Sequence, residues 1–187
     1  MSSIPQIIEY LLRQWAVDPK DENFADTPRR AATWLSDFAP KSKDEEQQLI
    51  RETLSPVFPE SHNEMVIVRN IRFSSLCAHH LLPFRGIAHV GYIPRDGVVG
   101  ISKLARLVKG IAQQATLQEK ITRTVADAVF ETLNCEGVMV VLQADHLCMQ
   151  MRGVEDETAQ TVTSAVRGCF KTNSEGCKDE FLELIRR

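Results

Sequence analysis

The spacing of apolar residues changes near residue 56. Before that point, apolar side chains over residues 4–12 recur every three or four positions, which predicts a helix. "DTPRRAATWLSDF" carries a capping Asp or Thr followed by Pro, and "KSKDEEQQLI" leads as a polar segment into another helix. Pro56 and Pro59 then break the pattern. We therefore expect a helical arm over residues 1–56 and a second part over residues 57–187, together making one domain.

From residue 65 the chain becomes β-branched and partly alternates between apolar and polar positions. Four segments are predicted strands: 65–73, 85–93, 137–144 and 146–154. We expect the last two to form a hairpin that turns near Ala144 and Asp145.

Two helices are predicted between the strand pairs, marked by apolar residues at helical spacing: Leu104, Leu107, Val108 and Ile111, then Ile121, Val125, Ala128 and Val129. A last helix is predicted after the acidic "EDE", with one face made of Val162, Ala165, Val166, Cys169 and Phe170. The order ββααββ predicts an α+β fold with an antiparallel sheet.

The composition argues against whole classes of partner. The formal net charge is -3, so the chain has no basic field that would attract nucleic acid or a membrane surface. We find no basic start followed by an apolar run, and no apolar stretch near the roughly 18 residues of a membrane span. These features predict a cytoplasmic protein that binds neither nucleic acid nor membrane. The five cysteines are odd in number, so a disulfide framework is not expected, and Cys135, Cys169 and Cys177 are interpreted as plain thiols.

"CAHH" and "HLCMQMR" carry the candidate metal ligands. In a tight turn, Cys77 and His80 stand three residues apart on one face. If "HLCMQMR" is a strand, His146, Cys148 and Arg152 share the face opposite its apolar residues. Cys77, His80 and Cys148 would then hold a zinc ion with one open position, the arrangement of catalytic zinc sites. A closed structural site with His146 as the fourth ligand is the alternative.

Two further groups have both a structural and a functional interpretation. His79 is either a buried imidazole or a general acid–base beside the metal. Ser102 is a predicted helix N-cap, yet the cations Lys103 and Arg106 follow it in the first turn, where an anion such as phosphate would remove their conflict with the helix dipole. Arg152 on the ligand-facing side favours the phosphate interpretation.

"LQEKIT" opens the second central helix with Gln118 and Glu119. An acidic residue in a first turn is ordinary, and on the residues alone that is the simpler interpretation of Glu119. A carboxylate can also accept two parallel hydrogen bonds from the N1–H and 2-amino edge of guanine.

Several of these segments together resemble a known family. "SLCAHHLLPFRGIAHVGYIP", "VVGISKLARLV", "LQEKIT" and "DHLCMQMRGV", in this order, are similar to motifs of GTP cyclohydrolase I, and "ADTPRRAATW" resembles its N-terminal "TP-x-R" element. The resemblance runs from about residue 5 to the end of the chain. It implies the tunnelling fold, a four-stranded antiparallel sheet backed by helices. It also implies a homodecamer with active sites between subunits.

The resemblance also implies roles for individual residues. Cys77, His80 and Cys148 would bind Zn2+, and His79 and His146 would be the acid–base pair. Guanine would be held by Gln118 and Glu119. The residues expected at the triphosphate are Ser102, Lys103, Arg106, Arg152 and, from a neighbouring subunit, Arg30. The implied reaction hydrolyses GTP at C8, releases formate and gives 7,8-dihydroneopterin triphosphate.

The chain departs from the family pattern at two places that bear on function. The usual C-E-H-H motif has Ala78 in place of Glu, and Thr33 stands where the family often has Lys. Three hypotheses follow: a GTP cyclohydrolase I, a related tunnelling-fold enzyme, and a non-catalytic structural zinc protein. The second would act on another purine or pterin, as an epimerase or as a cyclohydrolase that stops at the ring-opened formamide.

Overall fold

The computed structural model describes residues 3–18, 20–173 and 176–186, and the chain divides into two compact units between Ala39 and Pro40. The arm boundary expected at residue 56 therefore falls inside the second unit. In the first unit, α1 (Ile4–Gln14) and α2 (Thr27–Asp37) pack on each other. Both helices were predicted, and their contact buries Leu12 and Ala32.

The second unit begins with α3 (Lys43–Thr53), which packs on α4 (Ile101–Ala112). Ser42 caps α3, because its hydroxyl accepts from the Glu45 backbone N–H at 3.3 Å and its own N–H donates to the Glu45 carboxylate at 2.8 Å. The polar segment expected to lead into this helix is thus part of the helix itself. Two short strands, β1 (Val57–Phe58) and β4 (Val98–Val99), pair with each other beyond it.

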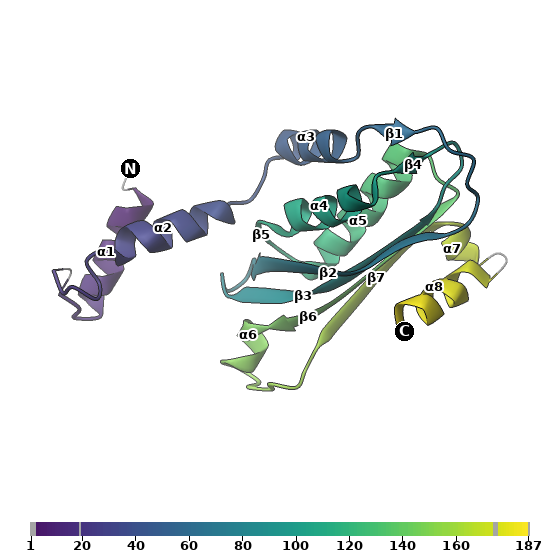
Figure 1. Ribbon diagram of the computed structural model, residues 1–187. Coiled ribbons are helices and arrows are strands. Elements are labelled where there is room, and N and C mark those ends of the chain that lie inside the picture. The colour runs from purple at the N-terminus through teal and green to yellow at the C-terminus, as the bar shows by residue number, and fades with distance from the viewer. Residues whose placement is uncertain (1–2, 19, 174–175, 187) are drawn as a thin grey trace. The chain divides into compact units, whose positions relative to one another are not determined.

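Four long antiparallel strands form the main sheet: β2 (Val66–Cys77), β3 (Pro83–Ile93), β6 (Gly137–His146) and β7 (Thr161–Gly168). A two-residue strand, β5 (Ala115–Thr116), lies parallel to the end of β2 and completes the order β5-β2-β3-β6-β7. The predicted α+β class, with a four-stranded antiparallel sheet backed by helices, is confirmed (Figure 1).

The helices α4 (Ile101–Ala112) and α5 (Gln118–Leu133) cover one face of this sheet (Figure 1). The apolar residues that predicted them are all buried in the main core. On the opposite face, α7 (Cys169–Thr172) and α8 (Cys177–Arg186) enclose a smaller apolar cluster that includes Phe170, Phe181 and Met139. Of the helices in the described ranges, none combines the length and apolar character needed to cross a membrane.

The structure corrects the predictions for residues 144–170 in two places. The strand expected over residues 146–154 is absent: β6 continues to His146, and the short helix α6 (Leu147–Gln150) follows. Its neighbour β3 begins at Pro83, so the pairing ends at Phe84 and His146, and the chain past His146 closes a helical turn instead. His146, Cys148 and Arg152 therefore do not share the face of one strand.

The last helix predicted over residues 162–170 is instead the strand β7 followed by α7. The apparent helical spacing arises because the two faces of β7 serve different clusters: Ala165 packs on the main core, while Val166 packs on the smaller one. Gly168, with φ of +57°, then turns the chain into α7. The hairpin partner of β6 is thus β7, which is not the segment next to it in the sequence.

Candidate metal centre and active site

Cys77 and His80 are held by a tight turn at the end of β2. The Cys77 backbone N–H donates to the Leu82 carbonyl at 2.9 Å, and the Leu81 N–H donates to the Cys77 carbonyl at 2.8 Å. Within the turn, the Ala78 N–H donates to the Thr116 carbonyl of β5 at 3.1 Å. This turn places the Cys77 Sγ atom 3.6 Å from His80 Nδ1.

Cys148 reaches the same point from α6, which follows β6; in the sheet, β3 separates β6 from the strand β2 that ends at Cys77. The candidate ligand atoms of Cys77, His80 and Cys148 all lie within 4.8 Å of one another. The chain brings these three predicted ligands together although the strand that was expected to carry Cys148 is a helix. His146 is not a member of this group, because its ring lies against other residues described below.

The donor set fits zinc. Two thiolates and an imidazole are soft ligands of the kind that bind zinc, and such ions are usually tetrahedral. With Zn–S near 2.3 Å and Zn–N near 2.0–2.1 Å, a tetrahedral ion holds a sulfur and a nitrogen about 3.6 Å apart. The separation of Cys77 Sγ and His80 Nδ1 in the structure, 3.6 Å, matches this value.

Electrostatics at the triad oppose the thiolate form in the metal-free chain. Burial raises the pKa of the Cys148 thiol, and the neighbouring Cys77 thiol raises it further. The positive charge of Arg152 acts in the opposite direction and favours the Cys148 thiolate. A bound cation would strengthen that effect, since a metal ligand must lose its proton.

His146 lies two residues before Cys148, and two other side chains hold its ring. Its ring stacks on Phe84 with centroids 4.3 Å apart and planes 7° from parallel, and its Nε2 atom lies 2.8 Å from Gln118 Oε1. Burial lowers the pKa of His146, and the charges of Glu119 and Asp145 partly offset that effect. The ring is therefore fixed in position and favoured in its neutral form.

The other predicted site residues near the triad are accessible to a ligand. Glu119 is exposed at the first turn of α5, where its charge reaches His146. His79 is exposed next to His80, with the two ring centroids 6.1 Å apart. Arg152 is exposed in the loop after α6. Gln118 differs from them, because it is 2% exposed and its amide is hydrogen-bonded inside the subunit.

Comparison with known proteins identifies the family of this chain. The model of the GTP cyclohydrolase I family matches residues 4–186. The chain belongs to the GTP cyclohydrolase I family. It is 48% identical to "GTP cyclohydrolase 1" of Desulforamulus reducens over 100% of this chain and 98% of that protein. It is 46% identical to "GTP cyclohydrolase 1" of Bacillus subtilis over 98% of this chain and 95% of that protein.

One solved structure is a more distant match. The archaeosine synthase QueF-Like in the apo form aligns with a TM-score of 0.44 and 20% identity, over 57% of this chain and 96% of that one. The likeness is too weak to bear on function. The resemblance read from the motifs is confirmed by the family match, and the chain is an enzyme of the GTP cyclohydrolase I family with the tunnelling fold.

The three α4 residues expected at a family triphosphate site lie away from the triad within one chain. Ser102, Lys103 and Arg106 occupy the first two turns of α4, whereas its last turn leads into β5, which pairs with Cys77. A helix of this length spans about 18 Å. The N-cap of α4 is Gly100, so the prediction that Ser102 caps this helix is wrong.

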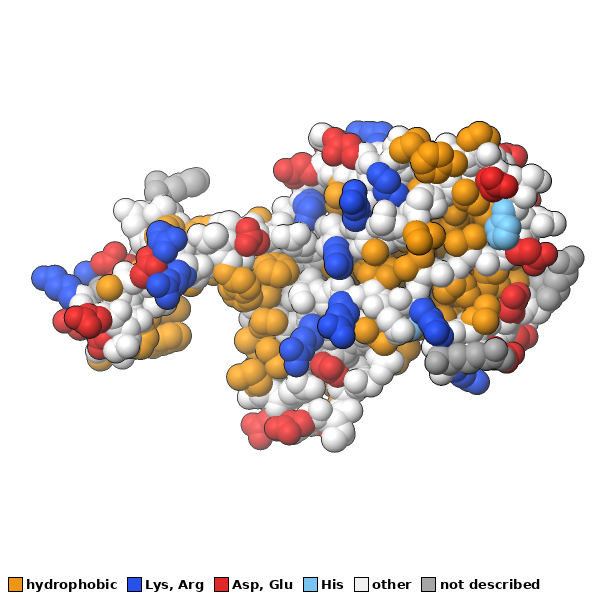
Figure 2. Space-filling view, in the orientation of Figure 1, with side chains coloured by type: hydrophobic (Ala, Val, Ile, Leu, Met, Phe, Trp, Pro, Cys, Tyr) orange, Lys and Arg blue, Asp and Glu red, His pale blue; other side chains and the backbone are white. Residues whose placement is uncertain are grey.

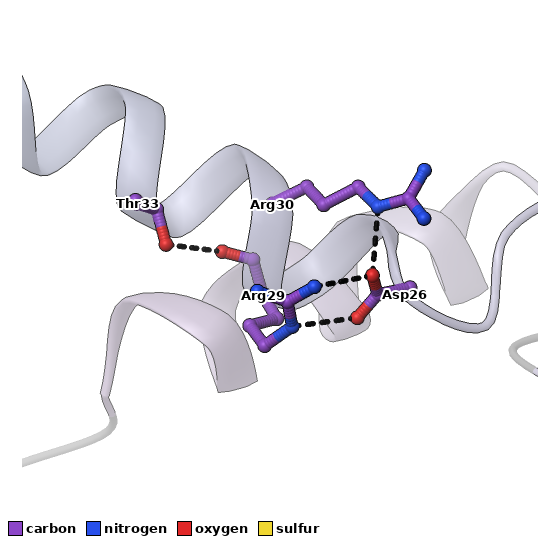
Figure 3. Close-up of polar contacts among 4 residues, drawn as sticks. All are labelled: Asp26, Arg29, Arg30 and Thr33. Atoms are coloured by element: carbon purple, nitrogen blue, oxygen red, sulfur yellow. Dashed lines mark hydrogen bonds and ion pairs between the residues drawn. The ribbon is translucent and has the colours of Figure 1, made fainter.

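Arg30 belongs to the N-terminal unit, where a family member would offer a cation from "TP-x-R". Arg29 donates two hydrogen bonds to the Asp26 carboxylate, from Nε at 2.8 Å and from Nη2 at 2.6 Å (Figure 3). Arg30 donates one, from Nε at 2.7 Å. These bonds, from Arg29 first and then Arg30, lower the pKa of Asp26 to about 2. At position 33, where the family often has Lys, this chain has Thr33, whose hydroxyl donates to the Arg29 carbonyl at 3.0 Å. This position therefore offers no cation in addition to Arg30.

Two parts of the site could not be found by reading motifs. Phe84 supports the His146 ring, yet it appears in the sequence as one apolar residue among several. Thr163 contacts Gln118 from β7, a segment whose spacing predicted a helix. Phe84 and Thr163 could have been found only from the pairing of β3 with β6 and of β6 with β7, which the local sequence pattern does not reveal.

Proposed function

We propose that the protein is a zinc-dependent GTP cyclohydrolase I that hydrolyses GTP at C8, releases formate and forms 7,8-dihydroneopterin triphosphate. The observation that carries this proposal is the convergence of Cys77, His80 and Cys148 beside His146 in a chain of this family. Three ligands leave one tetrahedral position open, which is typical of catalytic zinc.

In this proposal Cys77, His80 and Cys148 hold the zinc ion. When bound, it would supply Lewis-acid chemistry, activating water for hydrolysis at the guanine C8. His146 is the proposed proton donor at guanine N7: its ring is fixed in position, and because burial lowers its pKa, it gives up the proton readily once protonated. His79, exposed beside the triad, handles protons at the ribose during ring opening.

Glu119 is the proposed guanine anchor. Its exposed carboxylate lies at the first turn of α5, close enough to His146 to influence the imidazole electrostatically. A carboxylate there can accept both the N1–H and the 2-amino hydrogen bonds while N7 faces His146. Lys and Arg side chains gather over the α4 region and the sheet in Figure 2, although the whole chain has a formal net charge of -3.

We further propose a homodecamer with active sites between subunits. In the first two turns of α4, Ser102, Lys103 and Arg106 lie about 9 to 15 Å along the helix axis from the end of that helix next to the triad. If these cations bind the triphosphate of the same GTP, they come from another copy, as would Arg30. In the described sheet, β7 pairs only with β6, and β2 pairs with β5 at two positions only, so both edges can add strands of other subunits.

A single assay tests the activity. Zinc-loaded protein is incubated with GTP, and both formate and the fluorescence of the oxidised pterin are measured. Equal amounts of both products are expected. Light scattering on the same sample measures the oligomer. Zinc-loaded protein that leaves GTP intact would overturn the proposal.

Ala78 favours one alternative product. It is exposed within the turn that carries Cys77 and His80, and it brings no carboxylate where the family motif usually has Glu. A reaction that stops at the ring-opened formamide would give loss of GTP without pterin fluorescence. The cytoplasmic location stays a prediction of the sequence.

A further inference from the structure

The side-chain amide of Gln118 has only one orientation that its surroundings allow. Its Nε2 atom lies 3.3 Å from the Leu142 carbonyl, 3.0 Å from the Thr161 carbonyl and 3.1 Å from Thr163 Oγ1. Backbone carbonyls accept hydrogen bonds and cannot donate them. The NH2 group must therefore face these carbonyls, and Oε1 must face the other way. The partners thus decide between the two orientations of the amide, whose nitrogen and oxygen are otherwise hard to tell apart.

The neighbouring hydroxyl hydrogens are fixed by the same reasoning. Thr122 donates to the Gln118 backbone carbonyl at 2.8 Å, so its single hydrogen is used. Thr163 Oγ1 lies 2.6 Å from Thr122 Oγ1, and Thr163 must be the donor in that pair. Its oxygen then accepts from Gln118 Nε2. A flipped Gln118 amide would place its oxygen against two carbonyl oxygens. Because Gln118 is only 2% exposed, water could not separate these oxygens and relieve their repulsion.

This network determines which nitrogen of His146 carries hydrogen. Gln118 Oε1 can only accept, and it lies 2.8 Å from His146 Nε2. Nε2 therefore carries the hydrogen, and the stacked Phe84 ring prevents the imidazole from turning over. Nδ1 is left as the nitrogen that can gain or give a proton, and it has no hydrogen-bond partner in residues 3–18, 20–173 and 176–186.

We propose that Gln118 is a positioning residue that holds His146 as the Nε2–H tautomer, so that Nδ1 is the atom that exchanges a proton with the substrate. This rests on the proposed function for the substrate, GTP, whose N7 would face Nδ1. It replaces the guanine-binding role expected for the Gln118 side chain, because that amide is already committed to four partners in the subunit. Guanine recognition is then left to Glu119.

The tautomer can be observed without any turnover. Long-range 1H–15N correlation spectra of the zinc-loaded full-length protein, labelled with 15N-histidine, are recorded at a pH where the imidazole is neutral. The chain has five histidines, and His146→Asn assigns the signals of interest. We expect the nitrogen with a protonated-type shift to couple to both ring C–H protons, which identifies Nε2. A protonated-type signal at Nδ1 would overturn the proposal.

Variants then test whether Gln118 is the cause. Gln118→Met keeps the side-chain length but removes the acceptor, so the two nitrogen shifts should move toward each other as both tautomers become populated. The matched control is Gln114→Met. Gln114 is also 2% exposed, and its amide is bonded to the Ile111 carbonyl and the Lys41 N–H, away from His146. The control should leave the His146 signals unchanged; the same unchanged spectrum in Gln118→Met would contradict the proposal.

Kinetics separate positioning from guanine binding. A misoriented acid should lower kcat by about 100-fold while KM for GTP changes less than about threefold. A rise in KM at constant kcat would instead mean that Gln118 binds guanine directly. If the wild-type protein does not turn over GTP, the proposed function fails, while the spectra still decide the role of Gln118.

Discussion

The metal triad and the neighbouring His146–Gln118 pair differ in what holds them in place. The Cys77 and His80 ligand atoms lie 3.6 Å apart in one turn, and Cys148 approaches them from another element with its thiol beside Cys77; burial and that neighbouring thiol raise the pKa of Cys148. His146, in contrast, stacks on Phe84 and is hydrogen-bonded to a buried amide. The acid–base half is therefore built by the fold, while the metal half depends on an ion to complete it.

The largest expected effect comes from removing one ligand of the metal half. Cys148→Ser should lose bound metal, and turnover should fall by more than about 1,000-fold, because the Lewis acid is lost. Metal content measured by mass spectrometry and GTP turnover should fall together. The His146 tautomer should persist, since its support does not involve Cys148.

Cys169→Ser is the matched control for this experiment. Cys169 is also a partly buried free thiol, but it begins α7 and lies outside the triad. It should keep its metal and its activity. Full metal occupancy in Cys148→Ser would exclude Cys148 as a ligand.

A smaller effect is expected at Glu119, the exposed carboxylate whose charge acts on His146. Glu119→Ala should keep its metal but lower kcat/KM for GTP by about 100-fold, because two hydrogen bonds to a charged acceptor are lost. Steady-state kinetics with metal analysis check this. Glu131→Ala, an exposed carboxylate near the other end of α5, should behave as wild type. Equal losses in both variants would mean that general electrostatics, and not guanine recognition, explain the effect.

The same contrast predicts how zinc affinity depends on pH. Because the pKa of Cys148 is raised, the thiol is protonated near neutral pH in the metal-free protein, and zinc must displace that proton. Zinc affinity should therefore rise with pH, by about tenfold per unit for each proton displaced. Competition with a chelator between about pH 6.5 and 8.5 measures it.

Arg152 sharpens this pH experiment. Its charge favours the Cys148 thiolate, so Arg152→Gln should raise the pKa of Cys148 further and weaken zinc binding, by about two- to fivefold at a given pH. Arg123→Gln, an exposed cation on α5, is the control. Zinc affinity that is constant with pH would contradict protonated ligands in the free site.

How much of the site could be predicted follows from the range of the interactions that build it. The Cys77–His80 pair is local, three residues apart in one turn, and its geometry was foreseeable. α4 and α5 were foreseeable too, because one buried face gives each a clear helical period. The segment carrying Cys148 was predicted with the wrong structure, since the end of β6 depends on where β3 starts, at Pro83.

The support of His146 could not be predicted, and the reason is the same. Phe84, Gln118 and Thr163 come from three elements that meet only when β3, β6, β7 and α5 are assembled. β7 itself was misread because its two faces contact different apolar clusters, which hides the two-residue period of a strand. Local patterns therefore revealed the ligands and the acid, but not what orients them.

The smallest expected effect lies in the N-terminal unit, at Asp26. Arg29 binds this carboxylate through two nitrogens and Arg30 through one, so Arg30 keeps its terminal nitrogens for a ligand (Figure 3). The pKa of Asp26, about 2, means that the carboxylate stays charged at any working pH and that both contacts persist. Asp26→Asn keeps the shape but weakens the hold on Arg30. Because exposed ion pairs are weak, KM for GTP should change by less than about fivefold.

Arg30→Gln gives this experiment its reference. If Arg30 binds the triphosphate, its loss should raise KM for GTP more than Asp26→Asn does, because a charge-assisted contact is removed entirely. Arg29→Gln is the matched control. Arg29 is about as exposed as Arg30, but it donates to Asp26 through two nitrogens, where Arg30 uses one. An equal KM for Arg30→Gln and Arg29→Gln would remove Arg30 from the site. Binding of the triphosphate would then be left to the cations of α4 and to Arg152.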